Sequence, residues 1–429
     1  MPRRWVHRRS PRPGEARAAR WPRWLAAALA AGLATACGNA ATGGGSTTPI
    51  KVGFVLPLSG TVAANGQDER DGWNLGLKDA GSVVDGHPIQ TMFADGAADP
   101  TTALTVTHQL VENRGAQLLV GPIAANVGLA LRGYIASRGI PTVYMSACSD
   151  ELATSEKTPN LILTGWTCDQ PSLPFGTYVY QKLGYHHITT IGLDFAFGWQ
   201  VVGGFLKTFE AAGGTVDKQL WNPITTADFS PYVAQIPPDT QAVFALESGS
   251  TAVKFLQAYQ QFGLKSKIPL IGGGTLTDYS SLRSDSPDAV LGVITPLMYA
   301  DGLDTPENRR FVDEYHAATG KYPSYYAESA YAGAKLVVAA LRKLHGDVSN
   351  PHQVLQALRS TQIVAPRGPV KLSSQTNSPI QNVYVRKVEL VDGVLRNVPI
   401  DTFRNVSPWG SLPRQQWEQE AAHYTRSSG

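Results

Sequence analysis

Short, unbroken hydrophobic runs alternate along this chain with longer segments whose hydrophobic positions have helical spacing. Residues 116–120 form one such run, and residues 127–137 then carry Leu131 and Ile135 on one helix face. A second run follows at 140–145. Because an unbroken run is typical of a parallel strand covered by helices on both faces, this stretch predicts a strand, a helix and a second strand.

The same alternation continues on both sides of this unit. Further strands are predicted at 50–56, 89–93, 161–164, 188–193, 216–221, 243–246, 269–272 and 383–388, and further helices at 65–77, 101–114, 170–183, 197–212, 251–262, 306–319, 327–345 and 354–360. A steady alternation of this kind predicts an α/β architecture with parallel sheets and right-handed crossovers. Two similar lobes accommodate so many strands more readily than one sheet does.

Two small polar loops follow the first pair of strands, at 121–126 and at 146–150. Open α/β sheets bind ligands at the carboxyl edge of their strands. The first N–H groups of a helix have no intrahelical partner, so a carboxylate between these loops would be held without a charged side chain. The alternative is that both loops are only tight turns between a strand and a helix.

The amino-terminal residues have the order of an export signal. Residues 1–23 contain eight arginines, the next 13 residues form an apolar block, and Ala34-Thr-Ala-Cys37 resembles a bacterial lipobox. The block is too short to span a bilayer comfortably, so residues 1–36 are predicted to be a lipoprotein signal peptide and Cys37 the lipidated amino terminus. Plain secretory cleavage near Ala36 is the alternative.

The basic character of the chain lies in this signal. The full chain of 429 residues has 37 Lys and Arg against 34 Asp and Glu, a net charge of +3. Removing residues 1–36 takes away eight Arg and one Glu, which leaves 29 basic and 33 acidic residues and a net charge of −4. The composition therefore gives no electrostatic case for nucleic acid. Residues 37–49 are small and polar, as in a flexible tether to a membrane anchor.

Apart from Cys37, the chain contains Cys148 and Cys168. An exported chain with two thiols can pair them in a disulfide, and two unpaired buried thiols are the alternative. No C-x-x-C motif and no Cys/His cluster is present, so neither a metal nor a cofactor is predicted.

Specific landmarks occur in a fixed order. The chain reads Ile50-Lys-Val-Gly-Phe-Val-Leu-Pro-Leu-Ser-Gly60, then Gly66-Gln67, Asp99-Pro-x-x-Ala103, Val120-Gly121 and Phe197-Gly198. In order and spacing these resemble the leucine/isoleucine/valine-binding proteins, the branched-chain amino-acid family of type I periplasmic substrate-binding proteins that serve ABC transporters. The resemblance runs from Ile50 to about Ile400. Residues 325–331 and 366–370 are most similar to the branch associated with aromatic carboxylic acids.

The resemblance implies an α/β type I periplasmic binding protein with two doubly wound parallel-sheet lobes joined by a three-strand hinge. Residues 50–166 and 299–366 would form lobe 1, residues 167–298 and 367–405 lobe 2, and residues 406–429 an unassigned tail. The implied function is an exported solute-binding lipoprotein, periplasmic or at the cell surface, which closes on a small ligand and delivers it to an ABC permease. A ligand sensor of the same fold that feeds a receptor is the alternative.

The resemblance also assigns binding residues. The family's carboxylate cradle falls on Ala125, Ala147 and Ser149. Ala125 lacks the hydroxyl of the family's serine, and Asn126 is the candidate to replace that polar contact.

Other ligand contacts come from tyrosines in the family and fall here on Asn65, Phe197 and Ser248. An aromatic contact to the ligand side chain falls on Tyr326. Phe197 and Tyr326 lie near helix starts, where aromatic residues are more often part of the core. Trp166, at the proposed crossover, either contacts the ligand or covers the hinge.

The family's ammonium-binding glutamate falls on Gly274. A buried ammonium group needs an acceptor, so this loss predicts a small apolar or aromatic carboxylate as ligand in place of an α-amino acid. Glu247, at a neighbouring strand end, is either a solvated carboxylate or a replacement for that glutamate, which keeps branched-chain amino acids as the alternative ligands.

Catalytic motifs are missing from the sequence. It contains no G-x-S-x-G elbow, no Walker loop and no G-x-G-x-x-G after a strand, and Ser146 and Ser149 have no His base that the sequence identifies. The chain is therefore predicted not to be an enzyme.

Overall fold

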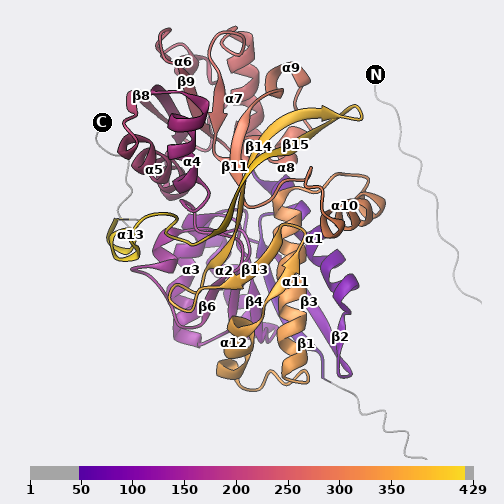
Figure 1. The fold of residues 1–429 in the computed structure, drawn as a ribbon. Coiled ribbons are helices and arrows are strands. Elements are labelled where there is room, and N and C mark those ends of the chain that lie inside the picture. Colours follow the sequence, from indigo (N-terminus) through magenta and orange to yellow (C-terminus); the bar gives the residue numbers. More distant parts are fainter. Residues whose placement is uncertain (1–47, 421–429) are drawn as a thin grey trace, which may run out of the picture. The chain divides into compact units, whose positions relative to one another are not determined.

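The computed structural model describes residues 48–420. The predicted signal peptide, Cys37 and most of the predicted tether lie outside these residues. The described part of the chain forms two α/β lobes, drawn one above the other in Figure 1. Between residues 48 and 420, no helix is both long and apolar enough to cross a membrane.

The first lobe is built on a six-stranded sheet in the order β2-β3-β1-β4-β5-β6. Its strands are β1 (Ile50–Leu56), β2 (Val83–Val84), β3 (His87–Asp95), β4 (Leu118–Val120), β5 (Thr142–Tyr144) and β6 (Leu161–Leu163). All neighbours pair in parallel except β2 and β3. The hydrophobic pattern missed β2 because two residues are too few to show a period.

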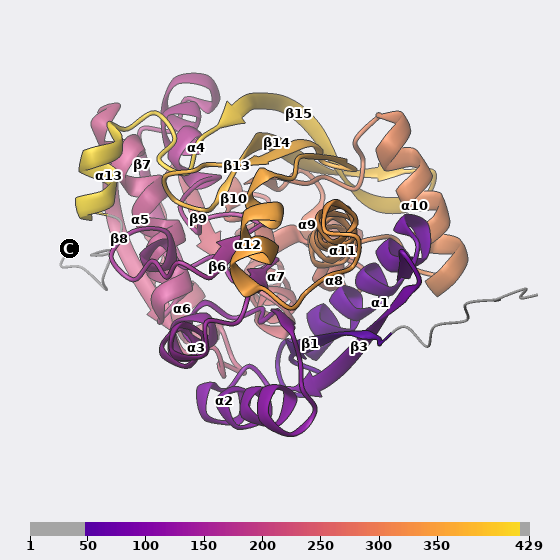
Figure 2. The ribbon, with the colours of Figure 1, turned by 90° about the horizontal axis from the view of Figure 1, so that it is seen from below.

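Helices cover both faces of this sheet (Figure 2). On one face lie α1 (Ala63–Ala80), α11 (Tyr325–Lys343) and α12 (Pro351–Ser360), and on the other lie α2 (Pro100–His108) and α3 (Ala125–Arg138). In β1, Phe54 packs against Trp73 of α1, with 5.5 Å between the ring centres, whereas Val55 packs toward Leu131 of α3. Successive side chains of a strand point to opposite faces, which is why the run is hydrophobic at every position.

A larger sheet extends from the second lobe into the first, ordered β12-β13-β14-β11-β10-β9-β7-β8, with β15 paired to β14; its β12 and β13 pack beside α11 of the first lobe. Its strands are β7 (His187–Leu193), β8 (Thr215–Asn222), β9 (Ala242–Leu246), β10 (Leu270–Gly272), β11 (Ile294–Leu297), β12 (Ile363–Ala365), β13 (Gly368–Leu372), β14 (Pro379–Val391) and β15 (Val394–Val406). Strands β7 to β11 pair in parallel, as predicted. β14 runs antiparallel to β11, so the sheet is mixed, which the sequence did not predict.

The predicted strand 383–388 is only the middle of β14, which pairs with β15 in a long hairpin. Its turn residues, Asp392 and Gly393, both have positive φ, the geometry that an Asp-Gly pair favours. This dipeptide between two apolar segments is the signal that would have predicted the hairpin.

The helices of the second lobe are α4 (Ser172–Tyr178), α5 (Ala196–Ala211), α6 (Ser230–Val233), α7 (Ser250–Gln261), α8 (Tyr279–Leu282) and α9 (Pro287–Val290), and α10 (Pro306–Thr319) leads back to the first lobe. The predicted helices 101–114 and 170–183 each end in a π-helical turn, at Gln109–Asn113 and Val179–Leu183. Side-chain periodicity does not distinguish such a turn from a continuing α-helix.

Three segments pass between the lobes: the chain after β6, the chain after β11 and the chain before β14. Gln170, in the first of them, donates from Nε2 to the carbonyl oxygens of Pro379 (2.8 Å) and Val406 (3.0 Å). The first passage is therefore tied to both strands of the terminal hairpin. A disulfide also joins Cys148 to Cys168, 20 positions apart and on either side of β6.

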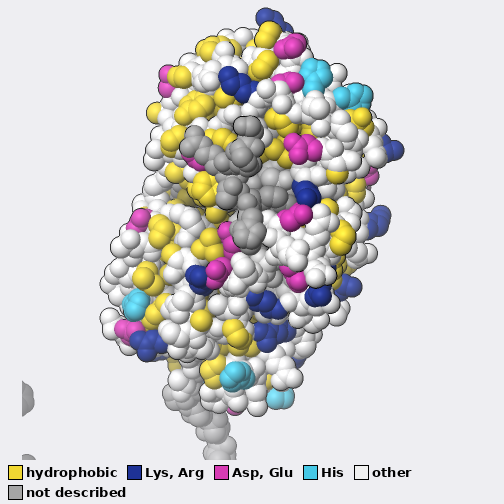
Figure 3. All heavy atoms as spheres, turned by 90° about the vertical axis from the view of Figure 1, so that its left-hand side faces the viewer, with side chains coloured by type: hydrophobic (Ala, Val, Ile, Leu, Met, Phe, Trp, Pro, Cys, Tyr) yellow, Lys and Arg dark blue, Asp and Glu magenta, His cyan; other side chains and the backbone are white. Residues whose placement is uncertain are grey.

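Part of the predicted unassigned tail is a helix, α13 (Arg414–Glu420). Its Trp417 is fully buried and donates from Nε1 to Asp169 Oδ2 at 2.6 Å. Figure 3 views the molecule from the side on which α13 lies in Figure 1, and there Lys and Arg side chains are interspersed with Asp and Glu.

Candidate ligand-binding site

A cavity of about 280 Å³ lies where the two lobes meet. Its walls are loops that follow strands β1, β3, β4, β5 and β6 of the first lobe and β7, β8 and β9 of the second, together with the start of α11. The lining residues are Val62, Ala98, Ile123, Ala124, Ala125, Asn126, Ser146, Cys148, Trp166, Leu193, Asp194, Phe195, Phe197, Pro223, Ile224, Ser248, Tyr325 and Tyr326. The cavity thus occupies the carboxyl edge of both sheets, where open α/β sheets bind ligands.

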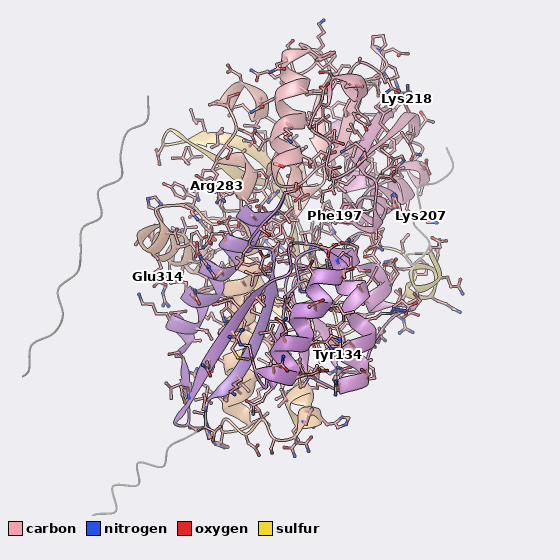
Figure 4. All side chains as sticks on the ribbon, turned by 180° about the vertical axis from the view of Figure 1, so that it is seen from behind. Tyr134, Phe197, Lys207, Lys218, Arg283 and Glu314 are labelled. Carbon is pink, nitrogen blue, oxygen red and sulfur yellow. A yellow bond between two sulfur atoms is a disulfide. The ribbon has the colours of Figure 1, made fainter. Side chains whose placement is uncertain are left out.

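Aromatic rings from both lobes form much of the wall. The Trp166 ring lies 6.0 Å from Phe197 and 5.7 Å from Tyr325, edge to face in both cases. Tyr325 and Tyr326 are 4.1 Å apart, and Phe195 and Phe197 are 6.1 Å apart. Figure 4 labels Phe197 at the level where the two lobes meet. A flat apolar ligand would therefore find aromatic faces on several sides.

The start of α3 supplies the polar part of the first lobe's wall. Its N-cap residue, Ala124, has no side chain that caps the helix, and Ala125 and Asn126 both line the cavity. The first backbone bond along the helix is that from Gly128 N–H to the Ala124 carbonyl, at 3.0 Å. The N–H groups of the first turn and the helix dipole suit an anion at this point.

Polar side chains complete the wall. Ser248 Oγ of the second lobe lies 3.2 Å from the hydroxyl of Tyr326 on α11, which bridges the two sides of the cavity. Ser146 is hydrogen-bonded to Glu69, a fully buried residue of α1. Burial raises the pKa of Glu69 to about 8, and the Ser146 hydrogen bond opposes that rise.

Six of the residues that the sequence assigned to the site line this cavity: Ala125, Asn126, Trp166, Phe197, Ser248 and Tyr326. Trp166 lines the cavity and is also anchored beside the crossover, because its Nε1 donates to the Ser146 carbonyl at 3.0 Å. Its contact with a ligand stays a prediction.

Ala147 and Ser149 do not line the cavity. In their loop Ser146 and Cys148 face it instead, and the Ala147 N–H donates to the Pro122 carbonyl at 3.2 Å. The Ser149 hydroxyl is hydrogen-bonded to Glu151. In this loop the side chains that face the cavity are therefore one residue away from the two that the resemblance assigned.

Gly274 is also absent from the wall. A Cβ atom there would lie 2.5 Å from Leu297 Cδ1 and 2.6 Å from the Pro296 carbonyl oxygen, closer than real Cβ atoms approach. Its own carbonyl accepts a 2.6 Å hydrogen bond from Nη2 of the buried Arg386. The position has no room for a glutamate.

Asn65 and Glu247 are fully buried behind the wall. Burial raises the pKa of Glu247 to about 8, and the side chains of Thr251 and Asn222 oppose that rise. Glu247 is not the solvated carboxylate that one interpretation of the sequence assumed.

Sequence reasoning missed several wall residues. Phe195 and Asp194 directly follow β7, and Asp194 Oδ1 accepts a hydrogen bond from Trp199 Nε1 at 3.1 Å. Tyr325 precedes the predicted Tyr326 at the start of α11. The rule that ligands bind at the carboxyl ends of strands would have found the first two, since their strand was predicted.

Comparison with known proteins agrees with this architecture. A family model described as periplasmic binding protein matches residues 49–393. The chain belongs to the periplasmic binding protein family. A Leu/Ile/Val-binding protein homolog of Brucella melitensis is 31% identical to it over 361 residues, which cover 82% of this chain and 91% of that protein.

Two similar solved structures are solute-binding proteins of ABC transporters from Rhodopseudomonas palustris. One, in complex with 3,4-dihydroxybenzoic acid, is 29% identical with a TM-score of 0.80 and covers 84% of this chain and 98% of its own. The other, in complex with benzoate, is 30% identical with a TM-score of 0.76 and covers 82% and 96%. The fold is therefore the type I periplasmic binding protein fold with two α/β lobes, and these two solved relatives are solute-binding proteins of ABC transporters.

Proposed function

We propose that this chain is the solute-binding component of an ABC transporter and that it captures a small aromatic or apolar carboxylate between its lobes. The observation that carries the proposal is a cavity that combines aromatic walls with an uncapped helix N-terminus. Its volume of about 280 Å³ is near the lower end of the roughly 300–1,000 Å³ found for small-molecule sites.

Each part of such a ligand has a partner in the wall. The carboxylate is bound by N–H groups at Ala125 and Asn126 and by Ser146, while the ring lies among Trp166 and Phe197. Aromatic contacts of this kind contribute about 0.5–1.5 kcal/mol each beyond the area that they bury. The aromatic acids bound by two relatives support this ligand class.

A hydrophobic α-amino acid is the second candidate, and Asp194 favours it. This carboxylate lines the cavity on the side of the second lobe, where an ammonium group could donate to it. The name of the Brucella relative supports the same possibility. Gly274 has no room for an acidic side chain, and Glu247 lies behind the wall, so Asp194 is the acceptor to test.

The rest of the transport cycle forms part of the proposal. Residues 50–166 with 299–366 and residues 167–298 with 367–405 act as two lobes that close by a hinge. Export through residues 1–36 and lipidation at Cys37 would hold the protein at the membrane, where it delivers ligand to a permease.

Calorimetry with leucine, phenylalanine, benzoate and 4-hydroxybenzoate tests the ligand class. We expect a benzoate to bind and leucine not to bind. Tight binding of leucine with neither benzoate would overturn the first candidate, and loss of leucine binding in Asp194→Asn would establish the second. Asp217→Asn, a variant of a β8 carboxylate that pairs with His187 and does not line the cavity, is the control for general effects of removing a charge.

A further inference from the structure

Glu69 lies one layer behind the wall of the cavity. It is fully buried on α1, and its Oε1 is hydrogen-bonded to Ser146 Oγ. Ser146 in turn lines the cavity. A titratable carboxyl group is therefore one hydrogen bond away from the space that a ligand would fill.

Several polar atoms beside Ser146 have no hydrogen-bond partner in the described part of the chain. Glu69 Oε2 and both polar side-chain atoms of Asn65 make no hydrogen bond with any described residue. The two residues are four positions apart on α1, so their side chains lie on the same helix face. Buried polar groups are nearly always hydrogen-bonded, so these exceptions behind the wall leave the hydrogen bonds of Glu69 room to rearrange when Ser146 changes its partner.

The groups around Glu69 do not offer it a positive charge. Ser146 comes from the loop after β5, and Tyr325 and Tyr326, both within electrostatic range, come from α11. Asp278 adds a further negative field at these tyrosines. The adjacent Asp68 points elsewhere, to Arg283. In the described chain no Lys, Arg or His pairs with Glu69, and its pKa of about 8 reflects burial.

We propose that Glu69 is a positioning residue for the ligand carboxylate. Protonated Glu69 donates a hydrogen bond to Ser146 Oγ, so that the Ser146 O–H donates to the ligand. A serine has one donor hydrogen. If Glu69 is ionised, it accepts that hydrogen, and the ligand meets only oxygen lone pairs and a buried negative charge. This inference rests on the proposed function, and it adds that carboxylate binding takes up one proton whenever Glu69 is ionised beforehand.

Calorimetry with benzoate between pH 6.5 and pH 10 tests the link. For the wild type we expect constant affinity at the lower pH values and a loss of about tenfold per pH unit above the pKa of Glu69. Glu69→Gln keeps a donor to Ser146 at every pH, so its affinity should stay within a few fold of the wild-type value at pH 6.5 and lose this slope. Buffers of different ionisation enthalpy should show close to one proton taken up per benzoate by the wild type at pH 9.5 and none by Glu69→Gln.

Glu247→Gln is the matched control. Glu247 is equally buried and its pKa is raised to a similar value, but no hydrogen bond joins it to a residue of the wall through its carboxyl group. This variant should keep the wild-type slope. Ser146→Ala is a second test should Glu69→Gln not fold, because it breaks the link from the other side and should lower the affinity and remove the slope.

The outcomes separate the two proposals. Equal slopes in the wild type and in Glu69→Gln, or no slope in the wild type, would overturn the role of Glu69 while the ligand class stands. Failure of the wild type to bind any of the carboxylates at pH 6.5 would overturn the proposed function and this inference with it. Benzamide carries no charge and can donate its own N–H to Ser146 Oγ, so its affinity should not depend on Glu69, and a Glu69-dependent slope for benzamide would contradict the proposed mechanism.

Discussion

Arg283 of the second lobe forms an ion pair with Asp68 of the first, with Nη1 2.9 Å from Oδ2 and 3.1 Å from Oδ1. Asp68 lies on α1 and is fully buried, while the Arg283 side chain remains 21% exposed. Burial raises the pKa of Asp68, and Arg283 opposes the rise. The pair thus spans the cleft at a place where separating the lobes would leave a buried carboxylate without its main partner.

Arg283→Gln should weaken ligand binding. Removing one partner of a buried ion pair costs up to about 3–5 kcal/mol, and partial exposure reduces this, so we expect a loss of about tenfold in affinity. Small-angle scattering of the unliganded variant should show a larger radius of gyration. Arg309→Gln, which removes an exposed pair with Asp304, is the control and should change neither quantity. Unchanged affinity in Arg283→Gln would exclude a role of the pair in closure.

Gly274→Ala should destabilise the protein. The new Cβ would overlap Leu297 and the Pro296 carbonyl, and overpacking of this kind costs about 1–3 kcal/mol. Gly274→Glu should be worse and should not create leucine binding. Thermal unfolding measures the first effect and calorimetry the second. Gly133→Ala, where a Cβ meets nothing within 4 Å, is the control. Wild-type stability in Gly274→Ala would refute the packing argument.

Glu247→Gln should change the pH dependence of stability. The folded-state pKa of Glu247 is about 8, above its ordinary value of 4.5, so its contribution to stability is fully present below pH 4.5 and is lost as the pH rises to 8. The glutamine variant lacks this loss, so its stability relative to the wild type should increase by up to about 1.4 kcal/mol per pH unit in that window. Urea unfolding at pH 5 and pH 8 measures it. A difference that is the same at both pH values would mean that Glu247 titrates normally.

Trp417→Phe should destabilise the carboxyl-terminal helix. The change removes the Nε1 donor from Asp169, a fully buried carboxyl group whose pKa is raised to about 7 by burial and held down by this hydrogen bond. Loss of one partner from a buried polar group costs about 1–3 kcal/mol. Limited proteolysis and thermal unfolding should both detect it. Trp409→Phe is the control, because it keeps an aromatic ring next to Trp417 and leaves the hydrogen bond to Asp169 in place. We expect it to have a smaller effect.

Cys37→Ser should release the protein from membranes if Cys37 carries a lipid. Membrane and soluble fractions of cells that express the two forms provide the measurement. Identical fractionation would favour plain secretory cleavage near Ala36. The ligand affinity of the variant should equal that of the wild type, since the cavity is built from residues of the two lobes.

The sequence by itself determined the α/β architecture, because the spacing of hydrophobic residues is local and each strand and helix carries its own signal. Phe54 and Val55 show the reason: both are apolar since β1 is buried on two faces. The order of strands and helices in turn located the carboxyl edges, and with them Ala125 and Asn126, whereas Phe197 and Ser248 came from the family resemblance. The order and spacing of the motifs indicated the family.

Tertiary structure alone decided which side chains line the cavity. Ser146 and not Ala147 faces the cavity because the loop after β5 is held by the Pro122 carbonyl, a contact that no local period encodes. Glu69 meets Ser146 across 77 positions of sequence, and Trp417 meets Asp169 across 248. Such pairs form only when separate elements pack together, because the burial that shifts a carboxyl pKa is a property of the assembled core and not of the residue's neighbours in sequence.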